Sequence, residues 1–257
     1  LVWALFLSFS SFAVVDPIVG PTSMCSPSVI SLTNATPGGT WSSSALAIAS
    51  VSLMGFVTAY DVGTANITYT VGTEYVVTTI TVNPTPLTFV VSGGGSYCSG
   101  GTGVNIGLMI SHVGVSYQLY LGSTAVGSPL PGTGSALNFG PQTTTGTYSI
   151  NATGAGGCTA NMTGSPTVSI NALPTAYTLT TGGACTGNNI VLSGSDAGTN
   201  YQLLLGGAAI GSTRPGTGLA LDFGTQTLSG VYTVTGTNAT TACVNTMGSA
   251  TINPTPV

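Results

Sequence analysis

The segment YQLYLG at residues 117–122 recurs as YQLLLG at residues 201–206, which lie 84 positions later in the chain. The same shift superimposes GTGSALNFG at residues 132–140 on GTGLALDFG at residues 216–224. A repeat with a period of this length indicates one structural unit that is present more than once. The sequence therefore predicts two copies of a single domain.

Apolar and polar residues alternate inside each copy, as in TYSIN at residues 147–151 and VYTVT at residues 231–235. Alternation with a period of two is typical of a strand with one buried face. The chain contains 38 glycines among 257 residues, and each glycine costs a helix about 1 kcal/mol relative to alanine. We therefore predict an all-β fold made of tandem immunoglobulin-like antiparallel β-sandwiches, with an apolar strand at the N-terminus.

The domain limits follow from a closing pattern in which a strand leads to an asparagine and then to proline, as at Asn83-Pro84 and Asn253-Pro254. Proline cannot donate to a strand ladder, so the strand ends there. The predicted division is an N-terminal strand at residues 1–16, a first immunoglobulin-like domain at 17–84, a second repeat at 85–174 and a third at 175–257.

Residues 17–84 contain WSS at 41–43, GFVT at 55–58 and GTANIT at 63–68. These motifs resemble the group-2 bacterial immunoglobulin-like domain, in which W-S-S, G-x-V-T and G-T-A-x-I-T mark successive strands and turns. The two later repeats resemble tandem sandwiches of large secreted surface proteins of Gram-negative gliding and biofilm bacteria. The resemblance implies adhesins, stalks and fibres, and none of its motifs is catalytic.

Residues 1–16 read as one apolar strand, because the odd positions carry large apolar side chains on what would be a single face. We predict that this face makes a subunit contact by completing the sheet of a neighbouring chain. Two alternatives stay open: the last strand of an upstream domain, or the remnant of a cleaved leader, since Ser11 and Ala13 suit a cleavage site. The predicted contact residues are Leu1, Trp3, Leu5, Leu7 and Phe9.

Four of the five cysteines form two pairs with nearly the same spacing. Cys98 and Cys158 are separated by 60 positions, and Cys185 and Cys243 by 58. The repeated spacing predicts one disulfide inside each copy and an oxidising compartment. Cys25 has no evident partner, so we interpret it as a buried apolar residue, with a bond between chains as the alternative. A zinc site is not expected, because C-x2-C spacing is absent.

Only six residues carry a full charge at neutral pH, namely five acids and Arg214. One cation cannot neutralise the phosphates of a nucleic acid, and an enzyme needs more acids and bases than this chain offers. The single histidine, His112, falls at the 84-residue shift on Asp196, within a turn segment of small residues. We therefore predict no enzyme activity, no cofactor, no metal and no nucleic-acid partner, and we assign His112 to a turn.

Sheet edges without charged residues can pair with another chain, so the sequence predicts head-to-tail self-association into a homopolymer. No apolar stretch of 18 residues occurs, and no membrane span is expected. The predicted function is a structural subunit of an extracellular bacterial filament or pilus-like surface fibre. The alternative is an adhesin stalk or glycan-binding module of a larger cell-surface protein, in which Tyr97, Tyr117 and Tyr120 are the candidate sugar contacts.

Sugar attachment is a further expectation for an extracellular chain that is rich in hydroxyl groups. The chain has 71 serine and threonine residues, which offer sites for O-linked sugar. Five N-x-S/T triplets add possible glycosylation sites at Asn34, Asn66, Asn151, Asn161 and Asn238.

Overall fold

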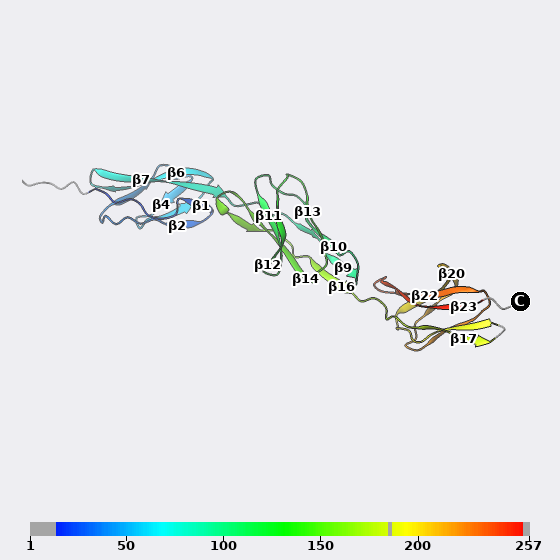
Figure 1. Cartoon of the computed structure of the whole chain (residues 1–257). Coiled ribbons are helices and arrows are strands. Elements are labelled where there is room, and N and C mark those ends of the chain that lie inside the picture. The colour runs from blue at the N-terminus through cyan, green and yellow to red at the C-terminus, as the bar shows by residue number, and fades with distance from the viewer. Residues whose placement is uncertain (1–13, 185–186, 254–257) are drawn as a thin grey trace, which may run out of the picture. The chain divides into compact units, whose positions relative to one another are not determined.

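The structure is a computed structural model that describes residues 14–184 and 187–253 (Figure 1). Within these ranges every regular element is a β-strand, apart from one short 3₁₀ helix. The predicted all-β class is confirmed. The chain divides into two compact units. The first contains the residues up to Gly93, Ile106–Gly140 and Thr147–Pro166, and the second contains Gly94–Asn105, Pro141–Gly146 and the residues from Thr167 onward.

The N-terminal sandwich lies in the first unit and consists of two sheets. One sheet has the strand order β1-β7-β6-β3 and the other has the order β2-β5-β4. Both sheets contribute to one core, in which Val57, Ile67 and Ile80 are completely buried. The strands are β1 (Ser23–Ser26), β2 (Val29–Ser31), β3 (Thr40–Ser43), β4 (Ala49–Val51), β5 (Phe56–Ala59), β6 (Gly63–Val71) and β7 (Glu74–Pro84).

The middle strands follow between residues 91 and 171. In the first unit β11 pairs with both β12 and β14, and β14 continues through a tight hairpin into β15. In the second unit β9 runs parallel to β16. The elements are β8 (Val91–Gly93), β9 (Gly95–Cys98), β10 (Val104–Leu108), β11 (Ser116–Leu121), β12 (Thr124–Pro131), β13 (Leu137–Gln142), β14 (Gly146–Thr153), the 3₁₀ helix η1 (Ala155–Gly157), β15 (Thr159–Asn161) and β16 (Thr167–Asn171).

The C-terminal sandwich lies in the second unit. Its first, second and fifth strands form the sheet β17-β18-β21, and the other four form the sheet β20-β19-β22-β23. This Greek-key arrangement of seven strands is of the immunoglobulin-like type. The strands are β17 (Leu179–Ala184), β18 (Gly187–Leu192), β19 (Thr199–Leu205), β20 (Ala208–Pro215), β21 (Leu221–Gln226), β22 (Gly230–Asn238) and β23 (Val244–Ile252).

The strands form three sets in chain order, namely β1–β7, β8–β16 and β17–β23. In each set, a glycine with positive φ begins a long strand. Gly63, Gly146 and Gly230 have φ values of 147°, 144° and 147°, a conformation that side chains with a Cβ rarely adopt. Two residues after Gly230, the Tyr232 hydroxyl donates a hydrogen bond of 2.7 Å to the carbonyl oxygen of Leu228. This bond has the form of the tyrosine corner of immunoglobulin-like domains. The glycine with positive φ therefore recurs at the start of the equivalent strand in each strand set.

Among the described residues, the C-terminal sandwich lacks the parallel strand that lies beside the last strand in the other two sets. β1 runs parallel to β7, and β9 runs parallel to β16, so these last strands have a partner at their outer edge. In the C-terminal sandwich the whole of β17 pairs with β18 instead. As a result β23 lies at the edge of its sheet.

The strand sets agree with the order of the predicted domains, but the division into compact units runs through residues 85–174. The predicted limits at residues 16, 84 and 174 therefore remain predictions. The predicted N-terminal strand lies mostly outside the described residues, which begin at residue 14.

Candidate functional site

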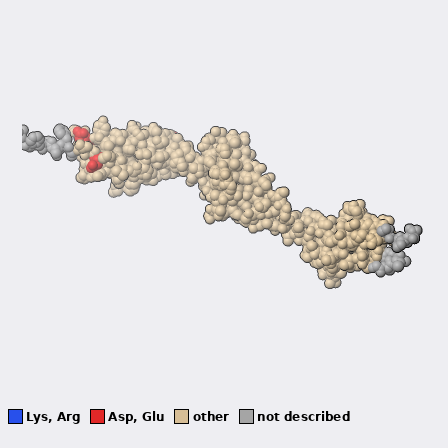
Figure 2. All heavy atoms as spheres, in the orientation of Figure 1, with Lys and Arg blue, Asp and Glu red and all other residues tan. Residues whose placement is uncertain are grey.

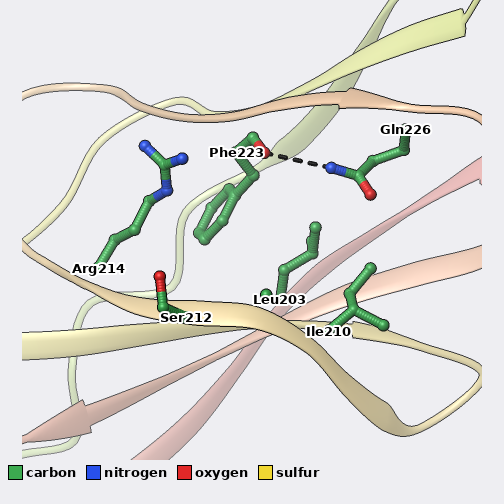
Figure 3. Close-up of a pocket in the computed structure, with 7 residues that line it drawn as sticks. Leu203, Ile210, Ser212, Arg214, Phe223 and Gln226 are labelled. Atoms are coloured by element: carbon green, nitrogen blue, oxygen red, sulfur yellow. Dashed lines mark hydrogen bonds between the residues drawn. The ribbon is translucent and has the colours of Figure 1, made fainter.

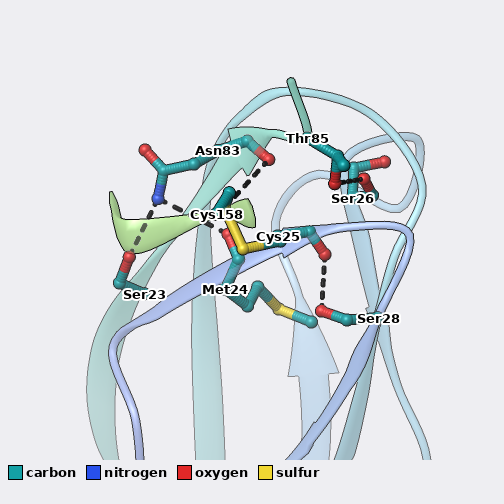
Figure 4. Close-up of a disulfide and its surroundings, with 8 residues drawn as sticks. All are labelled: Ser23, Met24, Cys25, Ser26, Ser28, Asn83, Thr85 and Cys158. Carbon is teal, nitrogen blue, oxygen red and sulfur yellow. Dashed lines mark hydrogen bonds between the residues drawn. A yellow bond between two sulfur atoms is a disulfide. The ribbon is translucent and has the colours of Figure 1, made fainter. Parts of the chain in front are cut away.

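The described residues show two features that bear on function: disulfides that join successive strand sets, and a small pocket around the single arginine. The first disulfide, between Cys25 and Cys158, has a Cα–Cα distance of 5.7 Å. Cys25 lies in β1 of the N-terminal sandwich, and Cys158 follows η1 in the hairpin between β14 and β15 (Figure 4). Both cysteines belong to the first compact unit.

Small and polar residues surround this disulfide. The Asn83 side chain donates a hydrogen bond of 2.8 Å to the Ser23 hydroxyl, and the Asn83 carbonyl oxygen lies 3.9 Å from the Cys158 sulfur (Figure 4). Gly156 has a φ of 63°, and a Cβ at this position would collide with the Asn83 amide. A glycine is therefore needed where the hairpin passes the end of β7.

The second disulfide repeats this arrangement in the second compact unit. Cys98 at the end of β9 is bonded to Cys243, which lies just before β23, with a Cα–Cα distance of 5.5 Å. Nearby, the Asn245 side chain donates a hydrogen bond of 2.8 Å to the carbonyl oxygen of Pro174. In both disulfides, a cysteine in the strand that runs parallel to the last strand of its set is joined to a hairpin cysteine of the following strand set.

The predicted pairing inside each repeat is therefore wrong for Cys98 with Cys158 and for Cys185 with Cys243. The similar spacing correctly made Cys158 and Cys243 equivalent positions, but such a spacing also arises when a first cysteine bonds to the second cysteine of the next repeat. The interpretation of Cys25 as a cysteine without a partner is also wrong. Cys185 itself lies outside the described residues.

Arg214 borders a cavity of about 190 Å³ in the C-terminal sandwich, lined by residues of β19, β20 and β21 (Figure 3). The guanidinium carbon lies 5.9 Å from the centre of the Phe223 ring, within the range of a cation–π contact. Gln226 donates hydrogen bonds to the carbonyl oxygens of Phe223 and Gly224. The remaining lining residues are Leu203, Ile210, Gly211 and Ser212. The pocket offers one cation and one hydroxyl on an apolar floor.

Two aspartates of the C-terminal sandwich have a lowered pKa. A hydrogen bond from Asn189 is the main cause for Asp222, and Arg214 adds a weaker attraction. Partial burial alone would raise the pKa of Asp196, but hydrogen bonds from the Thr175 N–H and the Tyr177 hydroxyl outweigh it. The carboxylate of Asp196 therefore accepts hydrogen bonds in a loop, and that of Asp222 accepts them within β21.

His112 lies exposed in a turn, as predicted, and its backbone N–H donates to the Tyr117 hydroxyl at 2.9 Å. Asp196 makes the same backbone bond to Tyr201 at 2.8 Å. The position therefore has a structural role in both repeats. Among residues 14–184 and 187–253, no three His, Cys, Asp or Glu side chains lie close enough together to hold a metal ion.

The three candidate sugar contacts differ in burial and in hydrogen bonding. Tyr117 is completely buried, Tyr97 donates to the carbonyl oxygen of Thr143, and Tyr120 is half-buried in β11. The asparagines of the N-x-S/T triplets at 66, 151, 161 and 238 lie in strands, and Asn34 lies in a loop. Their side chains form hydrogen bonds within the protein, such as the bond of 2.9 Å from Asn151 to Asn161. Their modification remains a prediction.

The face shown in Figure 2 is almost wholly without charge, with a few acidic atoms near the N-terminal end of the described chain. Large apolar side chains remain exposed on the N-terminal sandwich, among them Leu53 at 87% and Met54 at 81%. The described residues contain no helix with the length and apolar character needed to cross a membrane.

No family model matches the sequence, and no curated protein matches it either. The resemblance to the group-2 bacterial family therefore remains a prediction. Solved structures that are similar to this chain contain tandem immunoglobulin domains. They include the N-terminal eight domains of Down syndrome cell adhesion molecule (17% identity, TM-score 0.44, 93% of this chain and 42% of that chain). An I-band fragment of titin (10%, 0.37, 90% and 97%) and domains 1–5 of Sidekick-1 (12%, 0.33, 93% and 58%) are also similar.

This chain spans less than half of the cell adhesion molecule fragment and about three fifths of the Sidekick-1 fragment. These likenesses are weak, and the assignment of the fold rests on the strand pairing and the tyrosine corner described above.

Proposed function

We propose that this chain is a non-catalytic structural segment of an extracellular fibre, and that copies of it associate end to end. The observation that carries the proposal is the pair of disulfides that join each strand set to the next. A covalent bond across each joint keeps neighbouring sandwiches attached when the chain is pulled. Disulfides persist in oxidising compartments, which supports a location outside the cytoplasm.

The lack of charge supports self-association. Soluble monomers protect exposed sheet edges with lysine or other charges, and this chain has six charged residues in all. Its threonine, serine, valine and alanine side chains can pack between sheets without removing water from ions. The bacterial surface proteins that the repeats resemble place such segments in filaments and stalks.

Deleting residues 1–15 tests the proposal, because these residues supply the predicted donor strand. We expect the full chain to form filaments in electron micrographs and the shortened chain to remain monomeric in analytical ultracentrifugation. A variant with Ser8→Ala and Ser10→Ala keeps the odd apolar positions and serves as a control that still assembles. Filaments of normal length from the shortened chain would show that strand donation is not the mechanism.

A glycan-binding module is the second candidate, and the pocket at Arg214 is the observation that favours it. An arginine beside an aromatic ring, with a hydroxyl nearby, suits a sugar that carries a carboxylate. Screening the full chain on a glycan array tests this function, with Arg214→Leu as the matched variant because Leu130 occupies the same place in the preceding repeat. Hits on acidic sugars that Arg214→Leu abolishes support binding, and an array without hits excludes it.

A further inference from the structure

We propose that the free edge of β23 is the acceptor site for residues 1–13 of a second copy, which add as a strand parallel to β23. This inference rests on the proposed function and names the partner surface that end-to-end assembly would use. The donor is a segment of this same chain that lies outside the described residues.

The comparison among the three strand sets carries the inference. β7 has β1 beside it as a parallel partner over Ser23–Ser26, and β16 has β9 beside it over Gly95–Cys98. In the C-terminal sandwich, β23 pairs with β22 on one side. On the other side, the described residues supply one backbone bond, from the Gly248 N–H to the Tyr177 carbonyl, and no partner strand along residues 249–252.

β17, the first strand of the C-terminal sandwich, does not pair with the outer edge of β23. β17 is hydrogen-bonded to β18 along its full length, from Leu179 opposite Leu192 to Ala184 opposite Gly187. Among residues 14–184 and 187–253, no strand pairs with the outer edge of β23 along residues 249–252, and a sheet edge without a partner pairs readily with an added strand.

The two edges of the same sheet differ in protection. At one edge, β20 carries Arg214 and Pro215, which both hinder the addition of a strand. At the other edge, β23 contains no charged residue and no proline. Of these two edges, β23 is therefore the one open to pairing.

The donor segment has the composition that this place requires. Ala250 and Ile252 on β23 point into the core and are 9% and 5% exposed, so a strand added beside them would extend the same apolar layer. Residues 1–9 have large apolar side chains at every odd position and no charge. One face of the donor can thus continue the core while its backbone pairs with β23.

Hydrogen exchange on the full chain tests the site directly. We expect those amides of residues 249–252 that do not bond to β22 to exchange at least tenfold more slowly in assembled material than in dispersed chains. Thr251→Pro should reduce the assembled fraction at least tenfold, while the matched variant Thr213→Pro on β20 should assemble like the wild type. Assembled material in which residues 249–252 exchange as fast as in dispersed chains would overturn the acceptor site and leave the proposed function standing.

A peptide experiment separates the acceptor site from the proposed function. A synthetic peptide of residues 1–13 is added to the chain that lacks residues 1–15, and exchange is measured again. Slower exchange at residues 249–252 supports the site even if filaments never form, or if Thr251→Pro fails to fold. No binding of the peptide, or protection at other strands only, shows that the site is wrong.

Discussion

At the scale of single residues, one pair of opposite positions on two paired strands shows how two sandwiches fill the same place with different side chains. Tyr201 lies opposite Gly236, and a Cβ on Gly236 would lie 3.0 Å from the Tyr201 ring. In the N-terminal sandwich the equivalent pair is Trp41 and Tyr69, whose ring centres are 4.6 Å apart. Each sandwich thus fills the same place with a different division of volume, which explains how divergent repeats keep one fold.

Replacing Tyr232 with phenylalanine tests the tyrosine corner. The variant keeps the buried ring but loses the hydrogen bond of 2.7 Å to the Leu228 carbonyl. We expect the free energy of unfolding of the C-terminal sandwich to fall by about 1 kcal/mol. Urea denaturation measures the change, and Tyr75→Phe at an exposed position is the control with no expected effect. An unchanged midpoint for Tyr232→Phe would mean that the corner bond adds nothing to stability.

Low pH should weaken the loop that Asp196 holds. The folded pKa of Asp196 is lowered, so its carboxylate adds stability above its ordinary pKa, and that stability is lost as the pH falls below about 4. We therefore expect urea midpoints of the wild type and Asp196→Asn to differ at pH 6 and to converge near pH 2. A difference that stays constant with pH would show that the hydrogen bonds to Thr175 and Tyr177 do not depend on charge.

At the scale of elements, the sequence predicted the strands better than their connections. Alternation around Tyr148 and Ile150 indicated a buried face, and both side chains are at most 1% exposed. The partner of a strand could not be predicted in this way, because alternation indicates the buried face of a strand and not its neighbour. β1 and β9 pair with the last strand of their sets, whereas β17 pairs with the strand that follows it. That choice depends on contacts distant in sequence, and so does the choice of disulfide partner.

A disulfide between Cys98 and Cys243 and a disulfide between Cys98 and Cys158 predict different free thiols when Cys98 is removed. In Cys98→Ala the released thiol should be at Cys243, and mapping of alkylated peptic peptides locates it. Alkylation at Cys158 instead would favour the pairing inside the repeat.

The stability of the bond is the second measurement. The bond closes a separation of 145 residues, so its loss should cost up to about 5 kcal/mol in the free energy of unfolding. Cys243→Ala should lose the same amount as Cys98→Ala, and the double variant no more than either.

The pocket at Arg214 shows how sequence reasoning missed a feature. The alignment of the repeats placed Arg214 opposite Leu130 and so marked it as a charge that does not recur. The alignment gave no sign that the side chain lies over Phe223 beside a cavity, because the aromatic ring and the arginine come from different sheets. The available signal was a cation that appears in only one of the two copies.

At the scale of the whole molecule, the near absence of cationic residues determines which proteases can cleave the chain. Trypsin-like enzymes bind a lysine or arginine at the cleavage site, and the single Arg214 precedes Pro215. We expect trypsin to leave even the reduced and urea-unfolded chain intact on a gel, while chymotrypsin digests the same sample. Fragments after trypsin treatment would contradict this expectation and would show that Arg214 is accessible to cleavage despite the proline.

The bond between Cys25 and Cys158 also changes what a single break in the backbone does. The bonded residues enclose all of the chain from position 25 to position 158, including the proline-containing stretch after β7. Cleavage of one peptide bond anywhere in that interval leaves two fragments that stay covalently linked until a reductant cleaves the disulfide. Cleavage of the connection after β7 would therefore release no fragment on a non-reducing gel. A fibre of this chain would still transmit force after the peptide bond there had been cleaved, because the disulfide spans the break.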